Sequence, residues 1–228
     1  MIDENVLVLI KSFLEEDLPH RSDIEAVLLC GSYSLNRATD RSDIDLCYIG
    51  QFDSFMRENL TFKRKEIQLM IAPWSWYEEV IKEYERNGNI GTITTMIAKG
   101  ICLWGESDKL TELQELGKRY YMLGPSNLSA DETFKIKKRI SDLWNNYIDQ
   151  ESCSTSQSWL CFHLVNECIE SQFKLKQWWA VKAKHQLSEI REKDEYMAGL
   201  VEKCIESQGK DVNALETLCK YVTETNLT

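Results

Sequence analysis

The chain has 228 residues, of which 43% are apolar, and a formal net charge of −10. Its length suits one large or two modest domains, and its apolar fraction excludes the intrinsically disordered class. The acidic charge argues against a long nucleic-acid partner, because such a partner requires a basic stripe that displaces counterions from its phosphates. A small cationic substrate suits this charge, although acidity can also serve solubility alone.

The eight cysteines form no Cys-x-x-Cys pair, and most lie in apolar runs, as expected in a reducing compartment. The N-terminus lacks the basic start and apolar core of a signal peptide, and no apolar run approaches the roughly 20 residues that cross a bilayer. We therefore expect a cytoplasmic protein without a membrane span. The three histidines have no partner at metal-ligand spacing, so a zinc site is not expected.

The first fifty residues predict alternating helices and strands. Apolar residues at helical spacing predict a helix over 3–16, and a short run of branched residues predicts a buried central strand over Ile24–Cys30. Gly31 permits a sharp turn, and a short helix over 32–35 would present free N–H groups to phosphates. A second strand is predicted from Asp43 to Ile49.

The next seventy residues complete a sheet with helices on it. Residues 52–59 predict a short connecting helix or loop. Residues 63–73 alternate as a strand, with Glu66 and Gln68 on one face and Ile67 on the other. The later predicted elements are helices over 74–86 and 90–98, a short strand over 100–105, and a helix through Leu116.

The second half predicts helices and no convincing strand. Residues 123–130 are rich in turn formers, and Ser129 with Glu132 forms a capping-box pattern that begins a helix. Four apolar stripes at helical spacing then follow: Ile136 to Tyr147, Phe162 to Phe173, Tyr196 to Cys204, and Val212 to Val222. We expect two domains, 1–122 and 129–228, of which the second is a helical bundle.

Two carboxylates mark the start of the second strand. Side chains alternate along a strand, so Asp43 and Asp45 point to one face and repel each other unless a cation lies between them. Hard oxygen ligands of this kind suit Mg²⁺. Glu66 shares that face in the later strand. The alternatives are solvated acids on a polar edge strand and, for Glu66, an ion pair with the bases at 63–65, which could instead steer a triphosphate.

Gly31-Ser32, a ten-residue spacing, Asp43-Ile44-Asp45 and then Glu66 on a strand together resemble the nucleotidyltransferase superfamily of DNA polymerase β type. Within it, the chain resembles the small antibiotic nucleotidyltransferases. The resemblance implies an α/β (α+β) catalytic domain with a mixed sheet flanked by helices, followed by an all-α bundle. It also implies Mg²⁺-dependent transfer of a nucleotidyl group, with ATP the expected donor, to a hydroxyl of a small molecule such as an aminoglycoside or a lincosamide.

The resemblance gives these residues roles. It implies that Asp43 and Asp45 bridge two Mg²⁺ ions, that Glu66 completes the shell of the ion that activates the acceptor, and that Gly31 and Ser32 hold the phosphates. These are the expected catalytic and metal-binding residues.

The helical half offers weaker candidates. In some relatives the general base comes from the helical domain, and Glu167 and Glu170 are candidates for it here. Lys182 and Lys184 resemble lysines that approach the triphosphate in relatives, although a solvated face is the favoured interpretation.

Two further functions stay open. Minimal nucleotidyltransferase antitoxins carry the same ten-residue spacing and adenylylate a partner protein, although they usually lack so large a helical domain. An inactive relative that only binds a nucleotide is the other alternative, because the chain has Asn36 where the family often has glycine. Asparagine tolerates the left-handed conformation better than other residues with a side chain.

Overall fold

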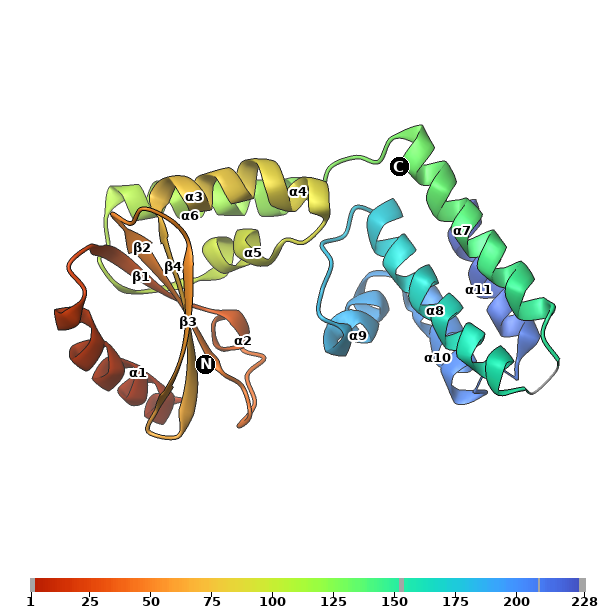
Figure 1. Cartoon of the computed structure of the whole chain (residues 1–228), viewed down its shortest axis with the longest axis horizontal. Helices are drawn as coiled ribbons and strands as arrows, with labels where there is room; N and C mark the ends of the chain where they lie inside the picture. The colour runs from red at the N-terminus through yellow and green to blue at the C-terminus, as the bar shows by residue number, and fades with distance from the viewer. Residues whose placement is uncertain (1–2, 152–153, 209, 226–228) are drawn as a thin grey trace. The chain divides into compact units, whose positions relative to one another are not determined.

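The computed structural model describes residues 3–151, 154–208 and 210–225. The chain divides into two compact units, Met1–Gly124 and Pro125–Thr228. The first unit is a mixed sheet flanked by helices and the second consists of helices, which confirms the predicted fold class (Figure 1). None of the helices in the described part of the chain is long and apolar enough to span a membrane.

The sheet of the first unit has the strand order β3-β4-β2-β1-β5. β2 and β4 run parallel, and the other neighbouring strands pair antiparallel. The strands are β1 (Ile24–Cys30), β2 (Ile44–Gly50), β3 (Met56–Phe62), β4 (Lys65–Pro73) and β5 (Ile101–Trp104). The predicted strands over 24–30 and 43–49 therefore lie side by side in its interior.

Helices cover both faces of the sheet, with α1 on one face and α3, α5 and α6 on the other (Figure 1). The helical segments of this unit are α1 (Glu4–Asp17), η1 (Leu18–His20), α2 (Gly31–Ser34), α3 (Trp74–Glu79), η2 (Val80–Tyr84), α4 (Glu85–Gly88), α5 (Thr92–Lys99) and α6 (Asp108–Leu123). The single helix predicted over 74–86 is thus interrupted by a π-helical turn, η2.

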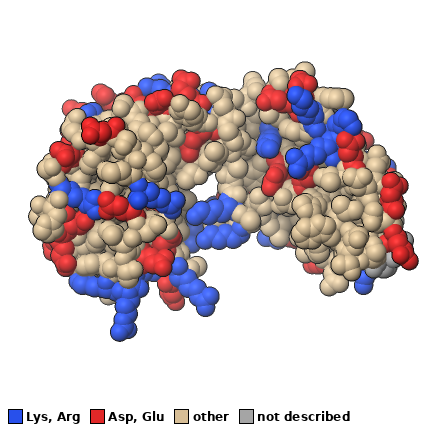
Figure 2. Space-filling view, viewed as in Figure 1, with Lys and Arg blue, Asp and Glu red and all other residues tan. Residues whose placement is uncertain are grey.

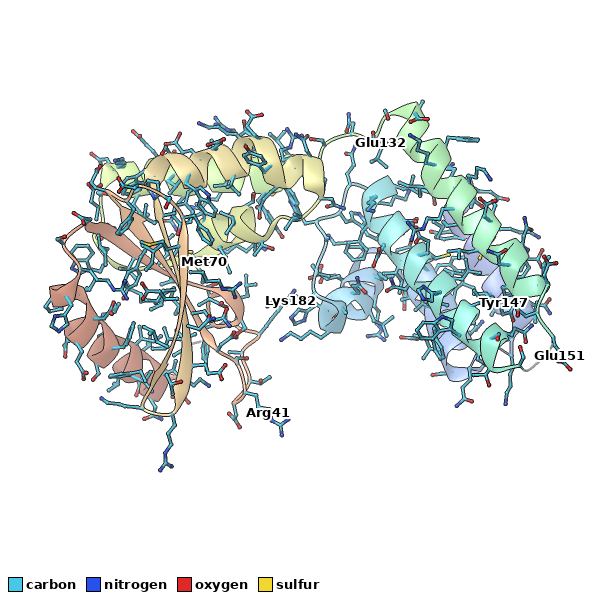
Figure 3. The ribbon with its side chains drawn as sticks, in the orientation of Figure 1. Arg41, Met70, Glu132, Tyr147, Glu151 and Lys182 are labelled. Atoms are coloured by element: carbon cyan, nitrogen blue, oxygen red, sulfur yellow. The ribbon has the colours of Figure 1, made fainter. Side chains whose placement is uncertain are left out.

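Strand alternation sorts the sheet residues between two apolar layers. Ile44 and Ile67 point towards α1, whereas Cys47 and Met70 point towards α3, α5 and α6. Met70 is labelled in Figure 3. The predicted alternation of β4 is therefore confirmed, and the face of the predicted acids is the one that α3, α5 and α6 cover further along the strands.

The expectation of a helix or loop over 52–59 is wrong from residue 56 onward, because β3 begins at Met56 and forms a hairpin with β4. The turn is made by Lys63 and Arg64, both at positive φ (47° and 69°), as in a type I′ turn. Glu58 interrupts the apolar alternation of β3, and it is held by Arg21, whose Nη2 lies 2.6 Å from Glu58 Oε2. Neither feature is evident from the local sequence.

The second unit is built from five described helices around one apolar core. They are α7 (Ala130–Ile148), α8 (Thr155–Leu175), α9 (Ala183–Lys193), α10 (Glu195–Glu206) and α11 (Val212–Glu224). The capping box of Ser129 and Glu132 at the start of α7 is confirmed. The four stripes did not predict α9. Three stripe members are largely exposed: Phe162 (46%), Tyr196 (59%) and Val212 (43%).

The described cysteines are all free thiols. Cys161, Cys168, Cys204 and Cys219 lie in the core of the second unit, where they pack as small apolar side chains. Burial raises the pKa of Cys161 to about 11.

Candidate functional site

Asp43 and Asp45 mark the start of β2, on the face of the sheet that packs against α3, α5 and α6 further along the strand. Asp43 directly precedes the strand and Asp45 lies within it; both are half-buried, whereas Cys47, next along on the same face, is fully buried. Buried Ile44 and Leu46 hold the opposite face against α1. The same alternation that anchors β2 thus presents its two carboxylates together.

Gly31 lies directly against the Asp45 carboxylate. A Cβ atom on Gly31 would come within 1.9 Å of Asp45 Oδ2, and Gly31 has a φ of +64°. Asp45 pairs with Cys30 across the β1–β2 ladder, which explains this approach. Burial, together with Cys47 and the negative charge of Asp45, raises the pKa of the Cys30 thiol. Gly31 therefore leaves room for the Asp45 carboxylate and also permits the turn.

Ser32, the next residue along, has an unsatisfied hydroxyl. Within the described part of the chain, Ser32 Oγ is buried and has no hydrogen-bond partner. Leaving a buried hydroxyl without a partner costs on the order of 1–3 kcal/mol, so such a group is unusual unless a ligand completes it. Asn36, which follows α2, has a φ of 54°, the left-handed conformation that a glycine would adopt easily. The turn therefore keeps its backbone path without the glycine.

Gln68 on β4 contacts the acidic pair. It is the partner of Asp45 in the parallel β2–β4 ladder, and its Nε2 donates a hydrogen bond to Asp43 Oδ2. Arg57 on β3 donates in turn from Nη2 to Gln68 Oε1. Sequence reasoning placed Gln68 on the correct face without a role and missed Arg57, because β3 was not predicted. Arg57, Gln68 and Asp43 thus form a chain across three strands.

Glu66 lies on the same face of β4 as Gln68, next to Ile67, which pairs with Ile44. Its side chain is exposed. No three His, Cys, Asp or Glu side chains come together to hold a metal ion anywhere in the described part of the chain. The structure therefore unites Asp43 and Asp45 on one face, while the role of Glu66 as their third ligand stays a prediction.

Basic residues lie at the β3–β4 hairpin and at the start of β4. Lys65 Nζ donates to the carbonyl oxygen of Asp40 at 2.9 Å, and Lys63 Nζ donates to Ser12 Oγ at 2.7 Å. Figure 2 shows a group of Lys and Arg atoms at the lower end of the first unit, over the β3–β4 hairpin. Arg41 extends from the loop between α2 and β2 (Figure 3). Lys63 and Lys65 thus have protein partners, and the role of the bases at 63–65 in steering a triphosphate stays a prediction.

The candidates in the second unit belong to separate interactions. Glu167 forms an ion pair with Arg139, with Nε to Oε2 at 2.8 Å, and Glu170 accepts a hydrogen bond from Asn166. Lys182 and Lys184 are exposed around the start of α9. Their predicted roles as a base and as phosphate ligands stay predictions.

No family model and no curated protein matches the chain. Among solved structures, the chain is similar to a nucleotidyltransferase-like protein from Exiguobacterium sibiricum, at a TM-score of 0.44 and 13% identity, over 93% of this chain and 74% of that one. The function proposed below rests on the residues of the site.

Proposed function

We propose that the chain is a Mg²⁺-dependent nucleotidyltransferase, which moves a nucleotidyl group, with ATP the expected donor, to a hydroxyl of a small molecule. The observation that carries this proposal is the pair of carboxylates, Asp43 and Asp45, on one strand face beside the unsatisfied hydroxyl of Ser32. Two carboxylates on one face are hard oxygen ligands that suit a divalent cation, and a buried hydroxyl without a partner suits an acceptor such as a phosphate oxygen.

The reaction sets what each residue must do. The acceptor oxygen bonds to the α-phosphorus of the triphosphate while the bond to the bridging oxygen breaks and pyrophosphate leaves. A divalent cation, when bound, neutralises charge on the triphosphate and on the leaving pyrophosphate. Asp43 and Asp45 would hold that cation, and the Ser32 hydroxyl would donate to a phosphate oxygen. The acceptor's proton must pass to a base, and Glu66 is the candidate of this unit that lies on the same face.

Nucleotide binding is the first test, because it needs no acceptor. The melting temperature of the full chain should rise with an NTP and Mg²⁺ together, and less with either alone; ligand at about 100 times Kd stabilises by about 2.7 kcal/mol. Asp45→Asn should abolish this rise. Asp53→Asn removes an equal charge from the loop after β2 and should leave it unchanged. The absence of a metal-dependent rise with any NTP would refute the proposal.

Ser32→Ala gives a second, independent signature. Removing a buried hydroxyl that has no partner should leave the free energy of unfolding unchanged or slightly raised, because the variant no longer bears the cost of desolvating that hydroxyl. The same change should weaken NTP affinity about tenfold, because a hydrogen bond to a charged phosphate is lost. Weaker folding with unaltered NTP affinity would mean that Ser32 is structural.

The acceptor requires a separate screen. The chain is incubated with α-labelled NTPs and Mg²⁺ together with panels of aminoglycosides, lincosamides and purified candidate proteins, and the product that carries the label is identified. Label on a small molecule supports the proposal, whereas label on a protein favours the protein-modifying alternative. Nucleotide binding without transfer to any acceptor favours the inactive alternative.

A further inference from the structure

The position opposite Asp45 is occupied by an amide and not by an acid. The parallel ladder between β2 and β4 pairs Asp45 with Gln68 and Ile44 with Ile67. Gln68 is half-buried within the sheet face, whereas Glu66 lies at the exposed start of β4. A third ligand for a cation held by the two aspartates must come from this face, and Gln68 is the half-buried residue that is in register with Asp45 and bonded to Asp43.

Both polar ends of the Gln68 side chain are engaged. Its Nε2 donates to Asp43 Oδ2, and its Oε1 accepts from Arg57 Nη2. A glutamine offers a donor and an acceptor at opposite ends of one amide, so these two bonds determine which end faces Asp43. The oxygen that could bind a cation thus faces Arg57, and the amide hydrogens face the carboxylate.

The charges on this face follow from the same contacts. Asp43 and Asp45 contribute two negative charges, Gln68 contributes none, and Arg57 adds a positive charge on the adjacent strand. Glu66 is the other acid of this face, at the exposed start of β4. Ligand charge is a principal determinant of divalent-cation affinity. Glu66 does not come together with Asp43 and Asp45 as a three-ligand cluster in the described part of the chain, so two ions close together lack the third carboxylate that would hold the second one.

We propose that Gln68, held by Arg57, occupies the third-ligand position, so that the site takes a single divalent cation at Asp43 and Asp45. Gln68 and Arg57 then act as positioning residues that orient the Asp43 carboxylate. This inference rests on the proposed function, since it deepens the metal site of that reaction. The site would then hold one cation with the triphosphate, in place of the two ions expected from three acids. The acceptor hydroxyl would have to lose its proton to a base that is not a metal ligand.

The test counts Mn²⁺ ions bound per chain by electron paramagnetic resonance, without and with a non-hydrolysable ATP analogue. The wild-type chain should bind one Mn²⁺ with the analogue. Gln68→Glu should bind two, and without nucleotide it should bind Mn²⁺ about tenfold more tightly than the wild type, because a carboxylate replaces a neutral amide. Glu66→Gln exchanges an acid for an amide two residues away on the same face, and its number of bound Mn²⁺ ions and its Mn²⁺ affinity should equal those of the wild type.

Arg57→Gln provides a second variant that is safe for folding, because Arg57 is exposed on the edge strand β3. It removes the positive charge and releases Gln68 Oε1, so Mn²⁺ should bind several-fold more tightly. Circular dichroism in EDTA establishes that each variant is folded. If Gln68→Glu does not fold, an unchanged Mn²⁺ affinity in Arg57→Gln overturns the inference by itself.

Other outcomes separate the two proposals. Two Mn²⁺ ions in the wild type, reduced to one by Glu66→Gln, would overturn the inference and make Glu66 the third ligand while leaving the proposed function standing. Tighter Mn²⁺ binding by Gln68→Glu with no binding of the analogue by any variant would support the inference and refute the proposed function. No Mn²⁺ bound by any variant overturns both.

Discussion

Replacing Gly31 with alanine tests the link between the turn and the acidic site. The new Cβ would come within 1.9 Å of Asp45 Oδ2, 2.8 Å of its Cγ and 3.1 Å of its Cβ. The neighbouring atoms belong to one side chain, so Asp45 can yield by rotating its carboxylate away. Gly31 also has a φ of +64°, where an alanine is strained whatever space it has.

These two costs can be estimated separately. The left-handed backbone costs alanine about 1–2 kcal/mol, and forcing Asp45 off its preferred rotamer costs about 1 kcal/mol more. We expect Gly31→Ala to lower the free energy of unfolding of the first unit by about 2–3 kcal/mol, which corresponds to a fall of roughly 6–12 °C in its melting temperature. Nucleotide affinity should also fall, because the rotated Asp45 carboxylate no longer lies beside that of Asp43, where the two would hold a cation together.

A double-mutant cycle measures the carboxylate contribution. Differential scanning calorimetry of the full chain gives the transitions, and hydrogen exchange at β1 and β2 identifies that of the first unit. In an Asp45→Ala background, Gly31→Ala should cost only the backbone strain, so the two changes should show a coupling of about 1 kcal/mol. Equal costs of Gly31→Ala in both backgrounds, or a cost below about 0.5 kcal/mol in the wild type, would refute the reasoning.

Three other predictions concern carboxylates that hold elements together. Glu85 is 4% exposed and accepts from two backbone N–H groups at the start of α5, each at 2.6 Å. Glu85→Ala should therefore destabilise the first unit by about 2–3 kcal/mol in chemical denaturation, and a smaller loss than about 1 kcal/mol would contradict this. The hydrogen bonds from Arg21 hold the pKa of Glu58 below its usual value of 4.5. The stability from this ion pair is thus present above pH 4.5 and lost as the pH falls through the pKa of Glu58 in the folded chain. Arg21→Gln should flatten the dependence of the free energy of unfolding on acid pH, and an unaltered dependence would contradict this prediction. In the second unit, burial and a hydrogen bond to Asp194 raise the pKa of Tyr221 to about 12. The stability that Tyr221 contributes is therefore present below pH 10 and lost as the pH rises towards 12. Tyr221→Phe should remove this loss of stability at alkaline pH, as followed by circular dichroism.

The sequence predicted most of the fold because local patterns there agree with tertiary packing. Branched residues in β1 and the alternation in β4 each reflect an apolar layer that the structure contains. β3 could not be predicted, since Glu58 takes an apolar position and is stabilised by Arg21, which lies 37 residues away. The turn at Lys63 and Arg64 carries no glycine or asparagine to signal a hairpin.

The candidate site divides in the same way. The sequence by itself determined the pair Asp43 and Asp45 on one face and the turn at Gly31, because strand alternation and short spacing are local properties. Only the tertiary structure decided that Gln68 is in register with Asp45 and that Arg57 holds it, because the register of a parallel pair depends on a crossover connection and on the packing of both faces.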